Sequence, residues 1–328
     1  MNLKRLHTLI RNPEQYHGEI ISPPFFEGWY FKVVTSDQKN AYAFIPGVSY
    51  SPDGSKDHAF IQVLDGNTGT VAVKEFAVDA FSAASDRFDI QLGENHFNRH
   101  QMRLDLVVDG RAFTGEMSFD SPISWPKTFL SPGIMGPFGW LWFLECNHGV
   151  LSFDHPIQGA LTVDEQIIDF TEGRGYIEKD WGKSFPSEWI WMQSNHFLTS
   201  GTSFTFSWAS IPFGLFQFKG VIAGLWHNGV LHSFTTYQGV RVTILRKETD
   251  LTEILLRQGR KKLWVKASRE KSGSLNAPTT AGMNRRIMES LDARLHVKMW
   301  VGNDLVFDEI GQSGGLEIVN QMIDSLSS

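Results

Sequence analysis

The chain of 328 residues has a single cysteine, Cys146, so it cannot form an internal disulfide. A lone thiol is typical of proteins that fold in a reducing compartment. Blocks of basic residues are also missing, because 30 Lys and Arg are interspersed with 36 Asp and Glu, for a formal net charge of −6. Proteins that bind nucleic acids present basic patches, and this distribution therefore argues against a nucleic-acid partner.

Long apolar segments are scarce. The strongest, FLSPGIMGPFGWLWFL at residues 129–144, is short for a bilayer span and contains Pro132 and Pro137. The first residues, MNLKRLHTLIRNPEQYHG, lack the apolar core of a secretory signal, and we expect a soluble, cytoplasmic protein. Residues 129–144 could form a pocket lid, a loop in transient contact with a membrane surface, or simply core. Their Pro and Gly favour an irregular loop over a helix.

Helical periodicity is limited to residues 3–11 and the tail at 317–325. Alternation of polar and apolar residues dominates instead, as in QMRLDLVV at 101–108. Asp109-Gly110 and Asn228-Gly229 each separate two alternating runs, which is a strong signal for a β-hairpin. Many short strands with Gly-rich turns predict an all-β protein of antiparallel barrels or sandwiches with little helix.

The chain is long for one small barrel. We expect two β domains, at residues 1–155 and 156–328, because NHGVLSFDHPIQ at 147–158 places turn residues between strand-like runs. A second polar stretch, KSGSLNAPTTAG at 271–282, predicts a long surface loop within the second domain. The sequence says nothing about oligomeric state.

The stretch YIEKDWG, at residues 176–182, concentrates charge in a strand-like run. On a strand, Glu178 and Asp180 point to one face, while Lys179 and Trp181 point to the other. Two carboxyl groups on one face can push their pKa values apart, so that one stays protonated near neutral pH and donates a proton. A solvent-exposed face with two unrelated acids would show the same spacing.

The next run, WIWMQSN, places Trp189, Trp191, Gln193 and Asn195 on one face by the same alternation. An aromatic row that ends in amides suits a pocket wall with an apolar floor and a hydrogen-bonding rim. A packing face between domains, with the amides capping neighbouring strands, is the alternative.

A third stretch, PPFFEGWYFK at residues 23–32, puts Glu27 and Trp29 on one face and Tyr30 on the other. Burial among aromatic rings would raise the pKa of Glu27 and suit it to acid catalysis. Alternatively, Glu27 pairs with an Arg or Lys across the sheet. Aromatic residues make up 13% of the chain, and Trp29 and Tyr30 in this stretch are candidates for ligand contact.

The histidines show no metal-binding pattern, and we predict no metal site. His96 and His100 are four residues apart, but they lie in a polar turn without helix support. The others are isolated: His58, His148, His155 and His196. Cys146 and His148 stand two apart on one predicted strand, where a nucleophile and its base seldom meet. A P-loop, a dinucleotide-binding fingerprint and a nucleophile elbow are absent.

Three motifs resemble the tocopherol cyclase family: FEGWYFK at 26–32, YIEKDWGKSFPSEWIWMQSN at 176–195 and SGGLEI at 313–318. The resemblance implies two lipocalin-like β-barrel domains. It also implies chemistry, because plant and cyanobacterial members close the chromanol ring of vitamin E. They protonate a prenyl double bond while the quinol hydroxyl adds to the resulting cationic carbon.

By this resemblance, Glu178 is the first candidate for the proton donor, Lys179 or Asp180 tunes it, and Glu27 is the reserve. We expect Glu178 to share an apolar cavity near the domain interface with Glu27 or Asp180. The family pattern has Asn at the position of Asp180 and Cys at the position of Ser194. The resemblance therefore supports the location of the site more strongly than the identity of the substrate.

Aromatic faces stabilise cations, which fits a prenyl channel lined by Trp181, Trp189 and Trp191. Gln193 and Asn195 would orient the quinol. No cofactor or metal is implied, because the addition is internal to the substrate. The chain is thus expected to act on a hydrophobic small molecule such as a prenylated quinol or another isoprenoid. A lipocalin-type carrier without chemistry is the alternative, and a carbohydrate-binding β protein a weaker one.

Overall fold

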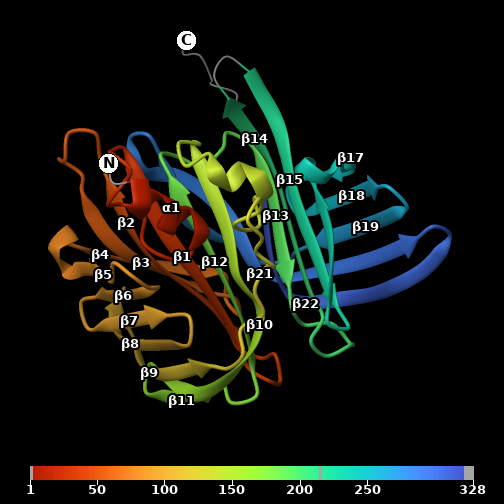
Figure 1. Cartoon of the computed structure of the whole chain (residues 1–328). Helices are drawn as coiled ribbons and strands as arrows, with labels where there is room; N and C mark the ends of the chain where they lie inside the picture. The colour runs from red at the N-terminus through yellow and green to blue at the C-terminus, as the bar shows by residue number, and fades with distance from the viewer. Residues whose placement is uncertain (1–2, 214–215, 321–328) are drawn as a thin grey trace, which may run out of the picture.

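A computed structural model describes residues 3–213 and 216–320 and confirms the all-β class (Figure 1). The predicted N-terminal helix is confirmed as α1 (Leu3–Arg11). Three short 3-10 helices, η1 (Val78–Ala80), η2 (Gly136–Trp140) and η3 (Thr236–Gln238), accompany it in the described residues. No helix in this part of the chain is long and apolar enough to cross a membrane.

The first sheet has twelve antiparallel strands and curls into a nearly closed barrel around an apolar core. Its strands follow the order β4 (Thr70–Phe76), β3 (His58–Asp65), β2 (Ala41–Tyr50), β1 (Phe25–Val34), β12 (Arg174–Gly182), β10 (Cys146–Val163), β9 (Arg111–Phe119), β8 (Gln101–Val108), β7 (Asn95–Asn98), β6 (Asp89–Leu92) and β5 (Phe81–Ala83), with β11 (Gln166–Asp169) beside β10.

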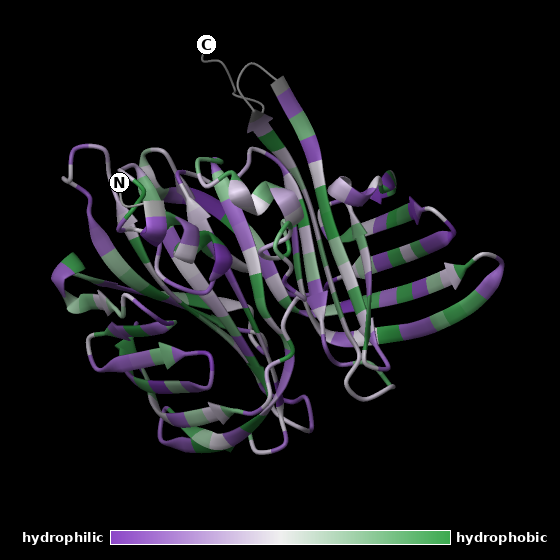
Figure 2. Cartoon of the chain, viewed as in Figure 1, coloured by the Kyte–Doolittle hydropathy of each residue, from purple (hydrophilic) through white to green (hydrophobic). Residues whose placement is uncertain are grey.

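The second sheet has ten antiparallel strands and its own apolar core. Its order is β16 (Val230–Thr235), β15 (Phe216–His227), β14 (Ser203–Phe213), β13 (Trp189–Ser194), β22 (Asp304–Val319), β21 (Gly282–Val301), β19 (Lys261–Ser268), β18 (Leu251–Gln258) and β17 (Arg241–Lys247), with β20 (Gly273–Thr279) beside β21. Hydrophobic and hydrophilic bands alternate along many of these strands (Figure 2).

The chain passes from the first sheet to the second between Gly182 and Trp189. The expected division after residue 155 falls inside β10, which continues unbroken while its pairing changes from β12, up to Pro156, to β9, from Ile157. A division into two domains stays a prediction, with residues 183–188 as the point where the sheets change.

Two expectations were wrong. Residues 271–282 do not form a surface loop, because β20 pairs with β21 and packs on the first sheet, where the Gln62 side chain bonds the backbone of Asn276 in both directions, at 2.8 and 2.9 Å. The helix predicted at 317–325 is wrong for its first three residues, because β22 continues to Val319. Residues 321–325 of that prediction lie outside the described chain.

The predicted hairpins at Asp109-Gly110 and Asn228-Gly229 are confirmed, as β8–β9 and β15–β16. All four turn residues have positive φ, between 47° and 78°. Two-residue turns with positive φ match the twist of the strands that they join, and Asn, Asp and Gly adopt that conformation most readily.

The centre of the first sheet is buried on both faces. In β1 and β12, Trp29, Phe31 and Ile177 point into the barrel core, whereas Tyr30 and Tyr176 point toward the second sheet. The alternation predicted for both segments is therefore confirmed. Each charged residue on these strands must be accommodated on one of two buried faces.

On the barrel face, Glu27 and Lys179 form a fully buried ion pair. Lys179 also donates to the backbone oxygens of Pro13 (2.9 Å) and Gln15, while the backbone N–H of His17 donates to Glu27 at 2.8 Å. Burial lowers the pKa of Lys179 to about 8, against the opposing effect of Glu27. The ion pair and these hydrogen bonds thus hold residues 13–17, which follow α1, against the barrel.

Replacing Glu27 by Gln should lower the free energy of unfolding by about 3–5 kcal/mol, because Lys179 would remain buried without its carboxylate. Urea denaturation followed by circular dichroism measures the change. Glu19→Gln is the matched control, since it removes an exposed partner of Arg5 and should cost less than about 1 kcal/mol. Equal losses in both variants would contradict a structural role for the buried pair.

Candidate active site

A cavity of about 170 Å³ lies between the two sheets. Its wall is mostly apolar and is built from both sheets and from η2 and its neighbours. The main apolar lining residues are Phe26, Tyr30, Ile45, Phe60, Met135, Phe138, Leu144, Phe185, Trp189, Trp191, Ile211, Ile222, Leu275 and Ile287. Five further lining residues are His148, Glu178, Asp180, Glu289 and Glu317, so the cavity combines apolar walls with several acids.

Glu178 points from β12 into this cavity and is 5% exposed. Tyr176 donates to its Oε2 at 2.5 Å, and Trp191 donates to the same oxygen from the second sheet at 3.0 Å. Burial raises the pKa of Glu178 to about 7; His148 opposes the rise and Asp180 adds to it. Near neutral pH, a large fraction of Glu178 is therefore protonated and able to donate a proton.

His148 enters the cavity from β10 and connects the two acids of β12. Its Nδ1 lies 2.9 Å from Oδ1 of Asp180, and its Nε2 lies 4.0 Å from Oε2 of Glu178. Burial alone would lower the pKa of His148, but the two carboxylates outweigh it and raise the pKa to about 9. The imidazolium therefore pairs chiefly with Asp180 and interacts more weakly with Glu178, which lies farther from it.

These three side chains also have the chemistry of metal ligands, with one candidate atom each and all three atoms within 4.8 Å of one another. Because His148 is already paired with Asp180 at 2.9 Å, we interpret the trio as an ion-paired acid–base group. The absence of a metal requirement stays a prediction.

A second acid pair comes from the other sheet. Glu289 of β21 and Glu317 of β22 stand opposite each other in the strand register and share a hydrogen bond. Burial, followed by the neighbouring Glu317, raises the pKa of Glu289 well above its usual range, and burial raises the pKa of Glu317 to about 7. Two carboxyl groups this close hold one proton between them, as paired acids do.

Hydrogen bonds cross between the sheets in both directions at these acids. Trp191 of the second sheet donates to Glu178 of the first, while Tyr30 of the first donates to Glu289 of the second at 2.6 Å. Trp189 completes the arrangement by donating to Glu317 at 2.5 Å. Each carboxyl group is thus held by an aromatic donor, and the donors also form the cavity wall.

The glycines of SGGLEI make room for this arrangement. A Cβ on Gly315 would lie 2.5 Å from the indole of Trp191, well inside van der Waals contact. Any larger residue there would displace the ring that donates to Glu178. The same motif ends with Glu317, so its spacing supplies both an acid and the space for an opposing tryptophan.

Four of the residues expected at the site lie on the barrel face, away from this cavity. They are Glu27, Trp29, Lys179 and Trp181. Burial alone would raise the pKa of Glu27, but Lys179 and His17 lower it, so the raised pKa expected for a reserve acid was wrong. Cross-strand pairing, the alternative, is what the structure shows. Glu178 shares its cavity with Asp180 and not with Glu27.

Gln193 and Asn195 share the face of Trp189 and Trp191 but act as contacts between the sheets. Gln193 accepts from Lys32 at 2.6 Å, and Asn195 donates to the Gly175 backbone oxygen at 2.9 Å. The two tryptophans therefore behave as a pocket wall, and the two amides as a packing face. Neither amide lines the cavity.

Sequence reasoning missed His148, Glu289 and Glu317. His148 looked isolated because its partners lie on a different strand, and Glu289 sits in an ordinary alternating run. Glu317 lies at the start of the predicted tail helix, but it belongs to β22. Residues 129–144 line the cavity through Met135, Phe138 and Leu144, as a partly buried irregular segment around η2.

Comparisons with known proteins identify a family whose matching region includes much of this cavity. The model of the tocopherol cyclase-like family matches residues 138–319, a range that includes His148, Glu178, Asp180, Glu289 and Glu317. The chain is 24% identical over 244 residues to the chloroplastic tocopherol cyclase of Zea mays, covering 57% of this chain and 50% of that protein. It is 25% identical over 250 residues to a probable chloroplastic tocopherol cyclase of Oryza sativa subsp. japonica, at 59% and 51%. The chain spans about half the length of these curated relatives.

Among solved structures, a Nitrosomonas europaea protein matches with a TM-score of 0.57 and 13% identity, over 94% of this chain and 96% of the other. CghA bound to Sch210972 matches at 0.56 and 12%, over 94% and 93%. Kievitone hydratase of Nectria haematococca matches at 0.52 and 14%, over 89% and 88%. These likenesses establish the shared lipocalin-like fold.

The pKa of Glu178 should rise further in Tyr176→Phe. The hydrogen bond from Tyr176 stabilises the ionised carboxylate, and the variant removes it. Carboxyl ¹³C NMR of labelled Glu, with Glu178→Gln to assign the signal, should give a titration midpoint of about pH 7 for Glu178 in the parent chain. Tyr50→Phe is a control that alters a hydroxyl bonded to Tyr16. A midpoint that stays at the same pH in Tyr176→Phe would show that the hydroxyl does not act on Glu178.

Proposed function

Because the chain belongs to the tocopherol cyclase-like family, we propose that it is a cyclase- or hydratase-type enzyme that works by acid catalysis without a cofactor. Its substrate would be a prenylated quinol or another isoprenoid. The observation that carries this proposal is Glu178, a buried carboxyl group with a pKa of about 7 in an apolar cavity. The family match and the tocopherol cyclases among its relatives support the same class of reaction.

In the first step, Glu178 transfers its proton to one carbon of the double bond, and the other carbon becomes a tertiary cation. Tyr176 and Trp191 both donate to Oε2, so Oε1 is the oxygen left for the substrate. These two bonds also stabilise the carboxylate that remains after transfer. A site that supports the charged product of proton transfer lowers the barrier to that transfer.

The cationic carbon would be stabilised by the aromatic wall. Tyr30, Trp189 and Trp191 line the cavity beside the acids, and their ring faces attract positive charge. The carboxylate of Asp180 adds a fixed negative charge nearby. Water would compete for such a cation, and the apolar residues around the cavity limit its access.

The second step forms the carbon–oxygen bond. The hydroxyl oxygen adds to the cationic carbon and its proton passes to a carboxylate, for which the Glu289–Glu317 pair on the opposite sheet is suited. One proton is taken from Glu178 and one is returned to the protein, so ring closure leaves the composition of the substrate unchanged. With water as the nucleophile, the same steps amount to hydration.

Replacing Glu178 by Gln should reduce turnover by about 10²–10⁴-fold, because an amide of similar size cannot donate the proton. Incubation with 2,3-dimethyl-6-phytyl-1,4-benzoquinol, followed by chromatography for the chromanol, measures it. Glu145→Gln is the matched control, since Glu145 lines the same cavity but is only half-buried. Other prenylated quinols and linear isoprenoids extend the assay when this quinol is not turned over.

Equal turnover in the parent chain and Glu178→Gln would remove Glu178 from the mechanism. Tight binding of the isoprenoids without any turnover would favour the alternative, a lipocalin-type carrier. Lipid extracted with the purified protein and identified by mass spectrometry would then name the ligand class directly.

The rate should depend on pH through the same group. Because the acid works in its protonated form, activity should fall about tenfold per pH unit well above pH 7. In Tyr176→Phe the falling limb should move to higher pH, since the pKa of Glu178 rises. A pH–rate profile of kcat/KM for both proteins measures this, and a limb that stays in place in the variant would contradict the assignment.

A further inference from the structure

We propose that the exposed apolar side chains of residues 129–143, together with α1, form a docking surface for anionic lipid bilayers. Phe129 is 66% exposed, Leu130 71% and Phe143 55%, although all three are large and apolar. They lie in the segment that also lines the cavity. This inference stands apart from the proposed chemistry, because it needs only a surface and a lipid.

Aromatic rings form two groups within this segment, and one of them contacts α1. The rings of Phe129 and Trp140 lie 6.1 Å apart, as do those of Trp142 and Phe143, and His7 of α1 lies 5.6 Å from Trp140. Trp and Phe, with an apolar body at the level of the headgroups, are the residues that proteins favour at a membrane interface. An irregular loop can present them at the surface without burying backbone groups.

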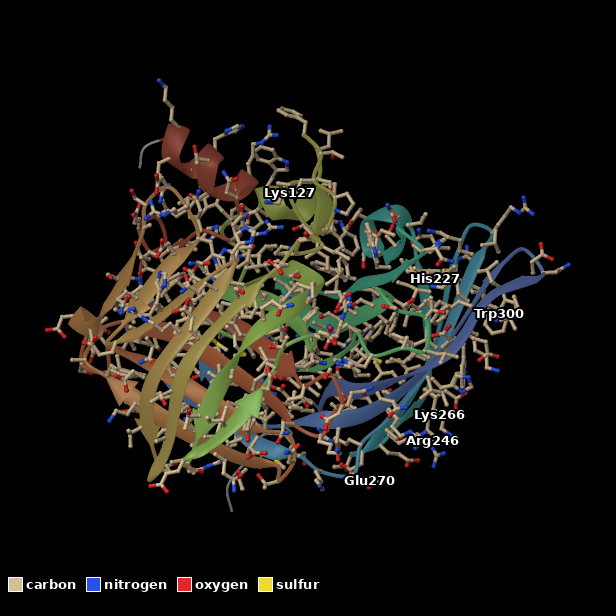
Figure 3. The ribbon with its side chains drawn as sticks, turned by 90° about the horizontal axis from the view of Figure 1, so that it is seen from below. Lys127, His227, Arg246, Lys266, Glu270 and Trp300 are labelled. Carbon is tan, nitrogen blue, oxygen red and sulfur yellow. The ribbon has the colours of Figure 1, made fainter. Side chains whose placement is uncertain are left out.

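Basic residues surround the aromatic ones. Leu6, Leu9 and Ile10 of α1 pack inward, which leaves its basic side chains outward. The guanidinium of Arg11 lies 5.7 Å from the ring of Phe129, and Lys127 adds a second positive charge beside the end of α1 (Figure 3). Positive charge gathered here, in a chain whose net charge is −6, is complementary to anionic headgroups.

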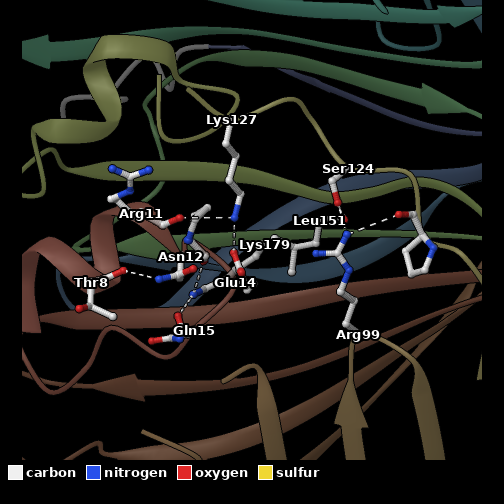
Figure 4. A network of polar contacts seen from close by, with 12 residues as sticks. Thr8, Arg11, Asn12, Glu14, Gln15, Arg99, Ser124, Lys127, Leu151 and Lys179 are labelled. Carbon is white, nitrogen blue, oxygen red and sulfur yellow. Dashed lines mark hydrogen bonds and ion pairs between the residues drawn. The ribbon is translucent and has the colours of Figure 1, made fainter. Parts of the chain in front are cut away.

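The neighbouring carboxylates are already neutralised. Lys127 pairs with Glu14 at 2.8 Å and also contacts the backbone oxygen of Arg11 (Figure 4), while Arg5 pairs with Glu19 at 3.0 Å. Repulsion from anionic lipid is thereby reduced. Met135 and Phe138 extend from the same segment into the cavity, so a bilayer docked here would lie close to the site.

Flotation with phosphatidylcholine vesicles, with and without phosphatidylserine, tests the proposal. The full chain should float with vesicles that contain phosphatidylserine and bind neutral vesicles more weakly. Replacing Phe129, Leu130 and Phe143 together by Ser should weaken binding to both by at least about tenfold, because three apolar contacts are removed. Arg11→Gln with Lys127→Gln should weaken binding only to the anionic vesicles.

Ile167→Ser with Leu198→Ser is the matched control, since these side chains are 78% and 92% exposed but lie outside the surface. The control should bind vesicles like the parent chain. Failure of the parent chain to float, or equal binding by the triple variant, would overturn the proposal. So would a dimer of the parent chain that the triple variant abolishes in size-exclusion chromatography, because the surface would then serve a second copy. None of these outcomes depends on turnover.

Discussion

The structure depends on how a sheet buried on both faces accommodates charge. Strands β1 and β12 run through its centre, and their side chains alternate between the barrel core and the second sheet. Toward the barrel, Glu27 and Lys179 neutralise each other. Toward the second sheet, Glu178 has hydrogen bonds and the His148 imidazole at 4.0 Å but no lysine or arginine, and its burial is relieved by holding a proton. One strand therefore carries both a structural ion pair and an acid that is partly protonated near neutral pH.

Local chemistry was enough to predict much of the fold. Turn residues located the hairpins, and alternation showed that Glu178 and Asp180 share one face and Lys179 the other. The missing information is nonlocal, because alternation does not say which face meets a cavity or which strand lies opposite. Glu289 and Glu317 become an acid pair only through the β21–β22 register, and β20 became a strand only because the first sheet offers it a packing surface.

The site concentrates acids where burial is costly. Glu178, Glu289 and Glu317 all line one apolar cavity, and no ion pair with Lys or Arg is found for them in the described residues. Such groups reduce stability unless they are protonated or hydrogen bonded. Here each has an aromatic donor, and the remaining cost appears as raised pKa values. Burial at this point therefore lowers stability and leaves carboxyl groups that can exchange protons near neutral pH.

The reciprocal hydrogen bonds between the sheets constrain how the sequence can change during evolution. Trp191 serves an acid of the first sheet and Tyr30 serves an acid of the second. Exchanging either half for that of another lipocalin-like protein would leave a carboxyl group without its donor and a donor without its carboxyl group. Although each half has a core of its own, the two halves can therefore diverge only as a pair.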